Sequence, residues 1–260
     1  MGLRAAGRAT YDLLMSIETA EELAGLRAAG RVVAETLRAM ARAVRPGVTT
    51  GELDAIAARM FRRAGARSGP QLDYGFPGAT CISVADEAVH GIPGPRRLRR
   101  GDLVKLDATA ELDGFYADAC ITVAVGPAPR TALALAATAR RALDAGMAAA
   151  RADAPLNAIG AAVESTVARR GHTVCAELTG HGVGRRVHEP PTVPSCFVAH
   201  FDEPLTEGLV LTIEPVVSTG SGALVGDDDG WTVRTADGTP VAQAEHTIVI
   251  RDGAPLVLTA

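Results

Sequence analysis

The chain repeats one order of segments, a helix pair followed by strands, and this order constrains the fold more than any single motif. Residues 19–44 and 49–65 have the apolar spacing of helices, and residues 131–151 and 155–170 form a second such pair. Segments of β-type composition follow the pairs at 79–85, 103–110, 115–124, 173–178, 208–218, 231–235 and 241–250. We therefore expect an α+β protein with two similar halves.

Local signals mark the ends of the first helix pair. Thr19 with Glu22, and Thr49 with Glu52, have the spacing of capping boxes, and Pro46 ends the first helix. A shift of 106 positions aligns Leu37 with Leu143, Arg45 with Arg151, Ala55 with Ala161, Arg63 with Arg169 and Gly65 with Gly171. In a chain this rich in Ala and Arg, the matches support an internal repeat only weakly.

Five side chains of metal-binding type are scattered from residue 107 onward. They are Asp107, Asp118, His181, Glu214 and Glu245. Four carboxylates and one imidazole suit a hard or borderline divalent ion such as Mn, Fe or Co better than a thiolate zinc site. More carboxylates are present than one small ion needs. Two ions roughly 3.5–4 Å apart can share bridging carboxylates and hold a hydroxide between them, so we predict a dinuclear hydrolase.

A hairpin predicts that the two aspartates lie together. Asp113-Gly114 is a tight-turn sequence, and a turn there places Asp107 opposite residue 118 or residue 120. Both registers put Asp107 and Asp118 on one face, where two like charges repel unless a proton or a cation lies between them. The alternative is that both point to solvent, which the apolar residues on either side make less favourable.

The other candidates differ in how specific their surroundings are. Glu214 ends a β-branched run before Pro215, and Glu245 is embedded in a strand-like segment; either carboxylate, taken singly, could alternate outward to solvent. His181 lies among glycines that permit close approach of the backbone to a metal or substrate. His188 follows seven residues later, so one imidazole could bind metal while the other acts on substrate.

Bulk properties narrow the class of protein. The 260 residues favour one domain, 1–260, and carry a formal net charge of −4, which gives no general electrostatic reason to bind DNA or a membrane. The four cysteines are far apart without a CxxC pair, and the N-terminus lacks an apolar signal segment. These features predict a cytoplasmic protein with reduced thiols and a small or peptidic substrate.

Seven motifs in order resemble one known family, the short bacterial type I methionine aminopeptidases. The motifs are VHGIP (89–93), KLDAT (105–109), DGFYADA (113–119), GHGVGRRVHEPP (180–191), TIEP (212–215), DGWTV (229–233) and AQAEHTIVI (242–250). The resemblance covers residues 19–258 and leaves residues 1–18 as an N-terminal extension. It implies a pita-bread fold, in which two pseudo-symmetric αβ halves surround a curved antiparallel sheet.

The resemblance also implies an activity and a metal site. The family removes the N-terminal methionine of nascent proteins whose second residue is small. Two divalent ions, Co, Mn, Fe or Zn, would be held as follows: Asp107 on one ion, Asp118 and Glu245 bridging both, and His181 with Glu214 on the second ion.

Catalytic and substrate-binding roles carry over in the same way. A metal-bridging hydroxide would attack the first peptide bond, Glu214 would move the proton, and His90 and His188 would hydrogen-bond the substrate. The resemblance places five residues around the methionine: Phe76, Cys81, His90, His188 and Trp231. A large rigid indole suits an unbranched thioether.

Three sites, with four residues in all, depart from the family pattern. Val187 stands where relatives usually carry phenylalanine, and Asp73-Tyr74 replaces a pair that is commonly an aromatic residue followed by histidine. Loss of a ring could widen the pocket, so altered side-chain tolerance is a hypothesis. Lys105 replaces a frequent asparagine on the Asp107 face of the strand, and we expect it to be solvated or to act behind the ligands.

Two other functions remain open from the residues. An Xaa-Pro aminopeptidase or dipeptidase of the same fold shares the five ligands but usually carries an additional N-terminal domain. A non-catalytic peptide-binding module would tend to lose ligands, whereas all five are present. We expect a monomer whose partner is the methionine terminus of a nascent polypeptide; Arg96, Arg97, Arg99 and Arg100 would provide transient ribosome contact or form a solvated patch.

Overall fold

The computed structural model describes residues 17–260, so the predicted N-terminal extension lies, except for residues 17 and 18, outside the described residues. Its four long helices, α1 (Ala20–Ala43), α2 (Thr50–Ala64), α4 (Arg130–Ala149) and α5 (Asn157–Ala168), confirm the predicted helix pairs. Both capping boxes form, with Thr19 before α1 and Thr49 before α2. The short helix α3 (Gly69–Tyr74) was not predicted.

Fifteen strands are assigned among the described residues, and all named pairs are antiparallel. The first half contains β1 (Arg67–Ser68), β2 (Cys81–Val84), β3 (Glu87–Val89), β4 (Leu103–Leu112) and β5 (Phe115–Ala124). The second half contains β6 (Thr173–Val174), β7 (Thr179–Gly182), β8 (Glu189–Pro194), β9 (Val210–Ile213), β10 (Val216–Ser218), β11 (Leu224–Gly226), β12 (Val233–Thr235), β13 (Val241–Gln243), β14 (His246–Val249) and β15 (Leu256–Val257).

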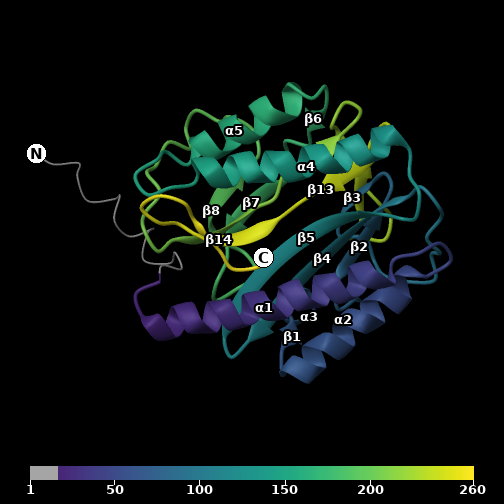
Figure 1. Cartoon of the computed structure of the whole chain (residues 1–260), viewed down its shortest axis with the longest axis horizontal. Coiled ribbons are helices and arrows are strands. Elements are labelled where there is room, and N and C mark those ends of the chain that lie inside the picture. Colours follow the sequence, from purple (N-terminus) through teal and green to yellow (C-terminus); the bar gives the residue numbers. More distant parts are fainter. Residues whose placement is uncertain (1–16) are drawn as a thin grey trace, which may run out of the picture.

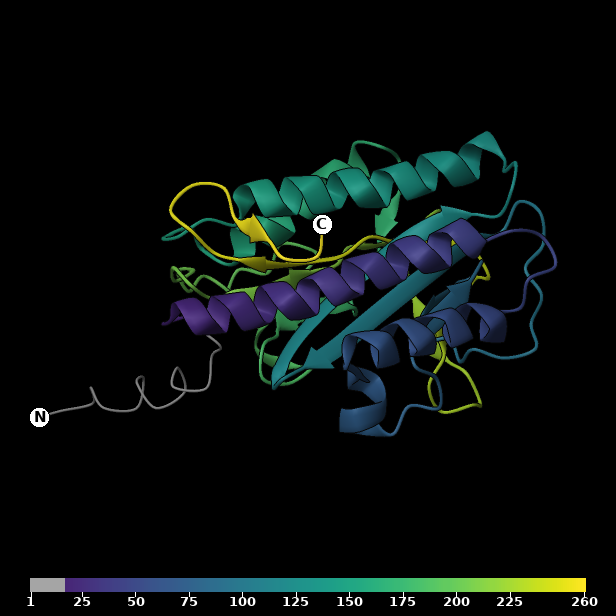
Figure 2. The ribbon, with the colours of Figure 1, turned by 60° about the horizontal axis from the view of Figure 1, so that its bottom comes forward.

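The helices cover the strands from two sides (Figure 1). Helix α1 packs on β4 and β5, and α2 packs on α1 and β1, around a core that includes Leu37, Met40 and Phe61. Helices α4 and α5 pack on the second half, where Leu143 and Ile159 are buried against β9. In Figure 2, α1 crosses in front of the β4–β5 hairpin, with α4 above it and α2 below it. Each helix pair therefore buries one face of its own half of the protein.

The weak repeat of the sequence corresponds to a repeat in the backbone. Gly65 after α2 and Gly171 after α5 both have φ of 72°, the left-handed conformation that glycine adopts without penalty. The N–H of Ala66 donates to the carbonyl of Phe61 (2.9 Å), and the N–H of His172 donates to that of Val167 (3.3 Å). The shift of 106 positions also relates the two donors, Ala66 and His172, and the two acceptors, Phe61 and Val167.

The β4–β5 hairpin has one of the two predicted registers. Asp107 lies opposite Cys120, and Asp118 lies opposite Thr109. Asp113 and Gly114 both have positive φ, 51° and 84°, as a two-residue hairpin turn requires. The two aspartates therefore share a face on diagonal positions of the hairpin.

Two predicted strands are each broken at a carboxylate. The segment 208–218 forms β9 and β10, which are separated by Glu214 and Pro215; the segment 241–250 forms β13 and β14, which are separated by Ala244 and Glu245. The prediction that Glu245 is embedded in a strand is therefore wrong. Its N–H leaves the local ladder and donates to the carbonyl of Cys120 on β5 (2.9 Å), which joins the second half to the first.

No helix in residues 17–260 combines the length and the apolar character needed to cross a membrane.

Candidate metal centre

The five candidate ligands line one cavity of about 280 Å³. Asp107 and Asp118 come from the β4–β5 hairpin, His181 from β7, and Glu214 and Glu245 from the two strand breaks. The hairpin belongs to the first half and the other three residues to the second. The cavity is thus formed where the two halves meet.

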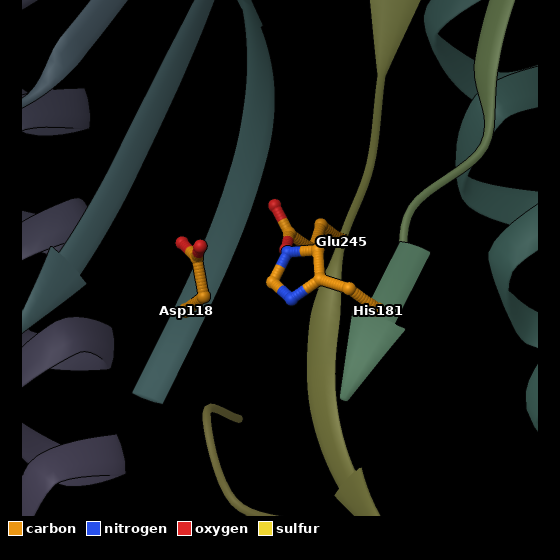
Figure 3. Close-up of side chains that lie close together, drawn as sticks. All are labelled: Asp118, His181 and Glu245. Carbon is orange, nitrogen blue, oxygen red and sulfur yellow. The ribbon is translucent and has the colours of Figure 1, made fainter. Parts of the chain in front are cut away.

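Three of the ligands are close enough to share an ion. One ligand atom from each of Asp118, His181 and Glu245 lies within 4.8 Å of the others. In Figure 3, Asp118 lies on one side of the site, and Glu245, from the break between β13 and β14, lies with His181 of β7 on the other. Glu214 extends this group, because its Oε1 atom lies 3.4 Å from Nε2 of His181.

Burial and mutual repulsion disfavour the charged form of each carboxylate. Burial, followed by the charge of Asp118, raises the pKa of Asp107 and that of Glu245 well above the usual range for carboxyl groups. The same two causes raise the pKa of Glu214 to about 8. Burial also raises the pKa of Asp118. Four acids in one cavity therefore create a strong demand for positive charge.

Unsatisfied oxygens point to the same conclusion. Within residues 17–260, Oδ1 of Asp118 and Oε1 of Glu245 are buried without a hydrogen-bond partner. Buried polar atoms normally have partners, and an ion supplies one. Nδ1 of His181 lies 2.9 Å from the carbonyl of Gly182, and burial lowers the pKa of this imidazole to about 3. A neutral ring that donates from Nδ1 leaves Nε2 free to bind a metal, so the residues present fit a divalent cation.

Groups behind the ligands orient them. Thr212 Oγ1 donates to Oε1 of Glu214 (2.9 Å) and accepts the N–H of His181 (3.0 Å). Nε2 of Gln243 lies 3.5 Å from Oε2 of Glu214. Sequence reasoning missed these positions. Thr212 could have been found, because it precedes Glu214 by two residues and strand alternation places both on one face.

The residues expected around the substrate line the same cavity. They are Phe76, Cys81, His90, His188 and Trp231. The rings of Phe76 and Trp231 meet edge to face with centroids 5.1 Å apart, which gives the pocket an aromatic wall. His90 has φ of 58°, an uncommon value for a non-glycine residue, directly after β3. The ring of His188 lies 4.1 Å from that of His181, centroid to centroid.

The three departures from the family pattern have different structural roles. Val187 and Tyr74 line the cavity, whereas Asp73 accepts a hydrogen bond from the N–H of Val187 (3.1 Å). Lys105 is fully buried, and its Nζ donates to the carbonyls of Ala85 (2.9 Å) and Val241 (3.2 Å). The expectation of a solvated lysine is therefore wrong, because the side chain connects a first-half turn to β13.

Comparisons with known proteins identify relatives of the chain in both sequence and structure. Residues 24–252 match the model of metallopeptidase family M24. Methionine aminopeptidase 2 of Bacillus subtilis (strain 168) is 41% identical over 247 residues, which cover 94% of this chain and 99% of that protein. The crystal structure of methionine aminopeptidase from Thermotoga maritima superposes with a TM-score of 0.91 at 32% identity, and covers 95% of this chain and 99% of that one.

A more distant structure shares the fold alone. Prolidase from Pyrococcus furiosus superposes with a TM-score of 0.76 at 21% identity, and the match covers 95% of this chain but 66% of the prolidase. Both solved structures have the pita-bread architecture, which confirms the predicted fold.

Proposed function

The chain belongs to metallopeptidase family M24, and we propose that it acts in this family as a methionine aminopeptidase that removes the N-terminal methionine of nascent proteins with a small second residue. The observation that carries this proposal is the 41% identity to a methionine aminopeptidase across nearly the whole of both chains. The cavity agrees with it, because five metal-binding side chains adjoin an aromatic pocket. One catalytic domain would include both halves, since each half contributes ligands.

The ligand arrangement supports two divalent ions of the Co, Mn, Fe or Zn type. Asp107 would hold one ion, His181 and Glu214 the other, and Asp118 and Glu245 would bridge them. When bound, such ions lower the pKa of a coordinated water and polarise the substrate carbonyl. The buried oxygens of Asp118 and Glu245 that lack a hydrogen-bond partner among residues 17–260 support this assignment.

The remaining chemistry belongs to side chains around the cavity. Glu214 would accept a proton from the attacking water and pass it to the leaving amine. His90 and His188 would donate hydrogen bonds to the substrate carbonyl and stabilise the charge that develops on its oxygen. Phe76, Cys81 and Trp231 would exclude water and hold the methionine side chain.

A peptide comparison tests the proposed activity. Metal-reconstituted protein should release methionine from Met-Ala-Ser and leave an Ala-Pro-Ser peptide intact. Cleavage of the Xaa-Pro bond alone would assign the chain to the proline-specific members of the fold. Tight peptide binding without cleavage, at full metal occupancy, would identify a non-catalytic module.

Cellular context is part of the proposal. We propose that the protein is cytoplasmic and that it acts as a monomer, because all five ligands come from one chain. We also propose a transient contact with the ribosome through the arginine-rich loop. In that loop Arg96 pairs with Glu87 and Arg97 donates to the carbonyl of Gly47, so these two also stabilise the fold. Arg99 and Arg100 are exposed. Co-sedimentation with ribosomes should weaken when both are changed to Glu.

A further inference from the structure

The C-terminal end of α3 contacts the loop that carries His188. The hydroxyl of Tyr74 lies 2.6 Å from Nδ1 of His188, and the two ring centroids are 5.5 Å apart. These residues are 114 positions apart in the sequence. Tyr74 is the last residue of α3, and the helix ends there because Gly75 adopts the left-handed conformation.

A second set of bonds fixes α3 at this place. Oδ2 of Asp73 accepts the N–H of Val187 (3.1 Å), directly before His188. Oδ1 of Asp73 accepts the hydroxyl of Tyr116 on β5 (2.9 Å). The last turn of α3 is thus tied both to the hairpin that carries Asp118 and to the backbone beside His188. The Tyr74 hydroxyl is therefore held at the imidazole by a defined scaffold.

The chemistry of the two groups sets the direction of the bond. A phenol is a stronger hydrogen-bond donor than a neutral imidazole N–H, and an imidazole nitrogen is a stronger acceptor than a phenol oxygen. Burial, followed by the charge of Asp73, raises the pKa of Tyr74, which keeps the hydroxyl protonated. Donation from Tyr74 leaves Nδ1 of His188 without hydrogen and places the hydrogen on Nε2.

We propose that Tyr74 is a positioning residue that holds His188 in the Nε2–H tautomer and in a fixed ring orientation. With Nδ1 occupied by Tyr74, Nε2 is the nitrogen left for the cavity that His188 lines. An N–H there can donate to a substrate carbonyl, whereas the other tautomer would present a lone pair and repel it. This inference rests on the proposed function for its catalytic consequence, but the tautomer itself is a property of the protein alone.

The tautomer can be read directly by ¹⁵N NMR of the metal-free protein. The chain has six histidines, and a His188→Asn variant identifies the His188 signals by their loss. At about pH 8, where ordinary neutral imidazoles predominate, Nε2 should show the shift of a protonated nitrogen and Nδ1 that of a bare one. Tyr74→Phe should move both shifts toward a mixture of tautomers.

Kinetics supply the second readout. Tyr74→Phe should lower kcat for Met-Ala-Ser roughly 10-fold with KM changed less than about twofold. This loss corresponds to about 1.4 kcal/mol, which is within the range that one hydrogen bond contributes. Tyr116→Phe is the matched control: it removes a hydroxyl from the same network that contacts Asp73 and not His188. The control should leave the His188 shifts in place and kcat within about twofold of the wild type, because the bond from the N–H of Val187 to Asp73 remains and still fixes α3.

The outcomes separate this inference from the proposed function. A bare Nε2 in the wild type, or unchanged His188 shifts and kcat in Tyr74→Phe, would overturn the role of Tyr74. If wild-type protein releases no methionine, the proposed function fails, and the NMR shifts still decide the tautomer. If Tyr74→Phe and Tyr116→Phe lower kcat equally and neither changes the ¹⁵N shifts of His188, the bond between Tyr74 and His188 only stabilises the fold. That result would also overturn the inference.

Discussion

Thr247 on β14 holds the backbone of Asp118 on β5. Its hydroxyl donates to the carbonyl of Asp118 (2.7 Å) and accepts the N–H of Asp118 (2.9 Å). One side chain from the second half thereby satisfies both backbone groups of a ligand from the first half. Thr122 on β5 makes the reciprocal arrangement with the backbone of Gln243, at 2.7 Å and 2.9 Å. The junction between the halves and the ligand geometry are therefore one structural unit.

Thr247→Val should destabilise the protein and weaken metal binding. The substitution keeps the shape of the side chain but leaves a buried N–H and a buried carbonyl of Asp118 unpaired, at a cost of about 3 kcal/mol in the free energy of unfolding. Urea unfolding of the metal-free protein measures this cost, and Mn titration measures affinity. Thr247→Ser retains the hydroxyl and should stay within about 1 kcal/mol of the wild type. Equal stability of all three proteins would contradict the role given to Thr247.

Asp118→Asn should have opposite effects on the metal-free and the metal-loaded protein. The charge of Asp118 raises the pKa of Asp107, Glu214 and Glu245, so its removal relieves repulsion. The metal-free variant should be more stable than the wild type by about 1 kcal/mol. In excess Mn the order should reverse, because the variant loses a bridging ligand. Thermal unfolding with and without Mn measures both, and a variant that is less stable under both conditions would contradict the electrostatic argument.

The metal-free protein should lose stability as the pH rises from about 6.5 to about 8. Burial, followed by the charge of Asp118, raises the pKa of Glu214 to about 8. The folded state therefore keeps a proton that the unfolded chain has released, and the resulting stability is present at low pH and lost as the pH rises through about 8. The expected slope approaches 1.4 kcal/mol per pH unit for one such proton. Urea unfolding at several pH values measures it.

Other groups limit that window. Burial lowers the pKa of His181 to about 3, so this ring is neutral in both states above about pH 6.5 and adds no slope. Burial lowers the pKa of Lys105 to about 8, which gives an opposite slope at higher pH. Glu214→Gln should make the profile less steep by up to about 1.4 kcal/mol per pH unit. Burial also raises the pKa of Asp107 and of Glu245, so these two carboxyl groups keep the remaining slope. A wild-type profile that is already flat, or that rises with pH, would be inconsistent with a protonated Glu214.

Local signals predicted much of the scaffold. The capping boxes at Thr19 and Thr49 mark the helix starts, and Asp113-Gly114 marks the hairpin, because each depends on residues within a few positions of one another. The same hairpin correctly placed Asp107 and Asp118 on one face. Strands β7 and β8 were missed, since their glycines and prolines hide the alternation that identifies a strand.

Long-range contacts could not be read from the residues. Alternation places Glu245 on a face but does not show that its strand breaks and pairs with Cys120. The hydrogen bond between Tyr74 and His188 likewise depends on an unpredicted helix and a distant loop. The solvated alternative for Lys105 was wrong because burial of a lysine requires two carbonyls that only the folded chain brings together. The catalytic assignment of individual residues came from motif resemblance rather than from local pattern.

Substrate preference around Val187 gives a further test. Val187 lines the cavity, and a side chain smaller than phenylalanine leaves room beside the substrate. We expect Leu- and Phe-initiated peptides to be cleaved alongside those that begin with Met or norleucine. Val187→Phe should lower kcat/KM for the Phe-initiated peptide roughly 10-fold and change that for Met far less. If the wild-type protein cleaves only peptides that begin with Met or norleucine, the hypothesis of a widened pocket is wrong.

Methionine release as a function of added metal tests the central claim most directly. Metal-free protein is titrated with Mn, and free methionine from Met-Ala-Ser is measured for the wild type and for Asp118→Ala. The account predicts negligible release without metal, an increase with Mn in the wild type, and loss of that increase in the variant. Release that is independent of metal, or equal in the two proteins, would contradict a reaction that depends on ions held between the two halves.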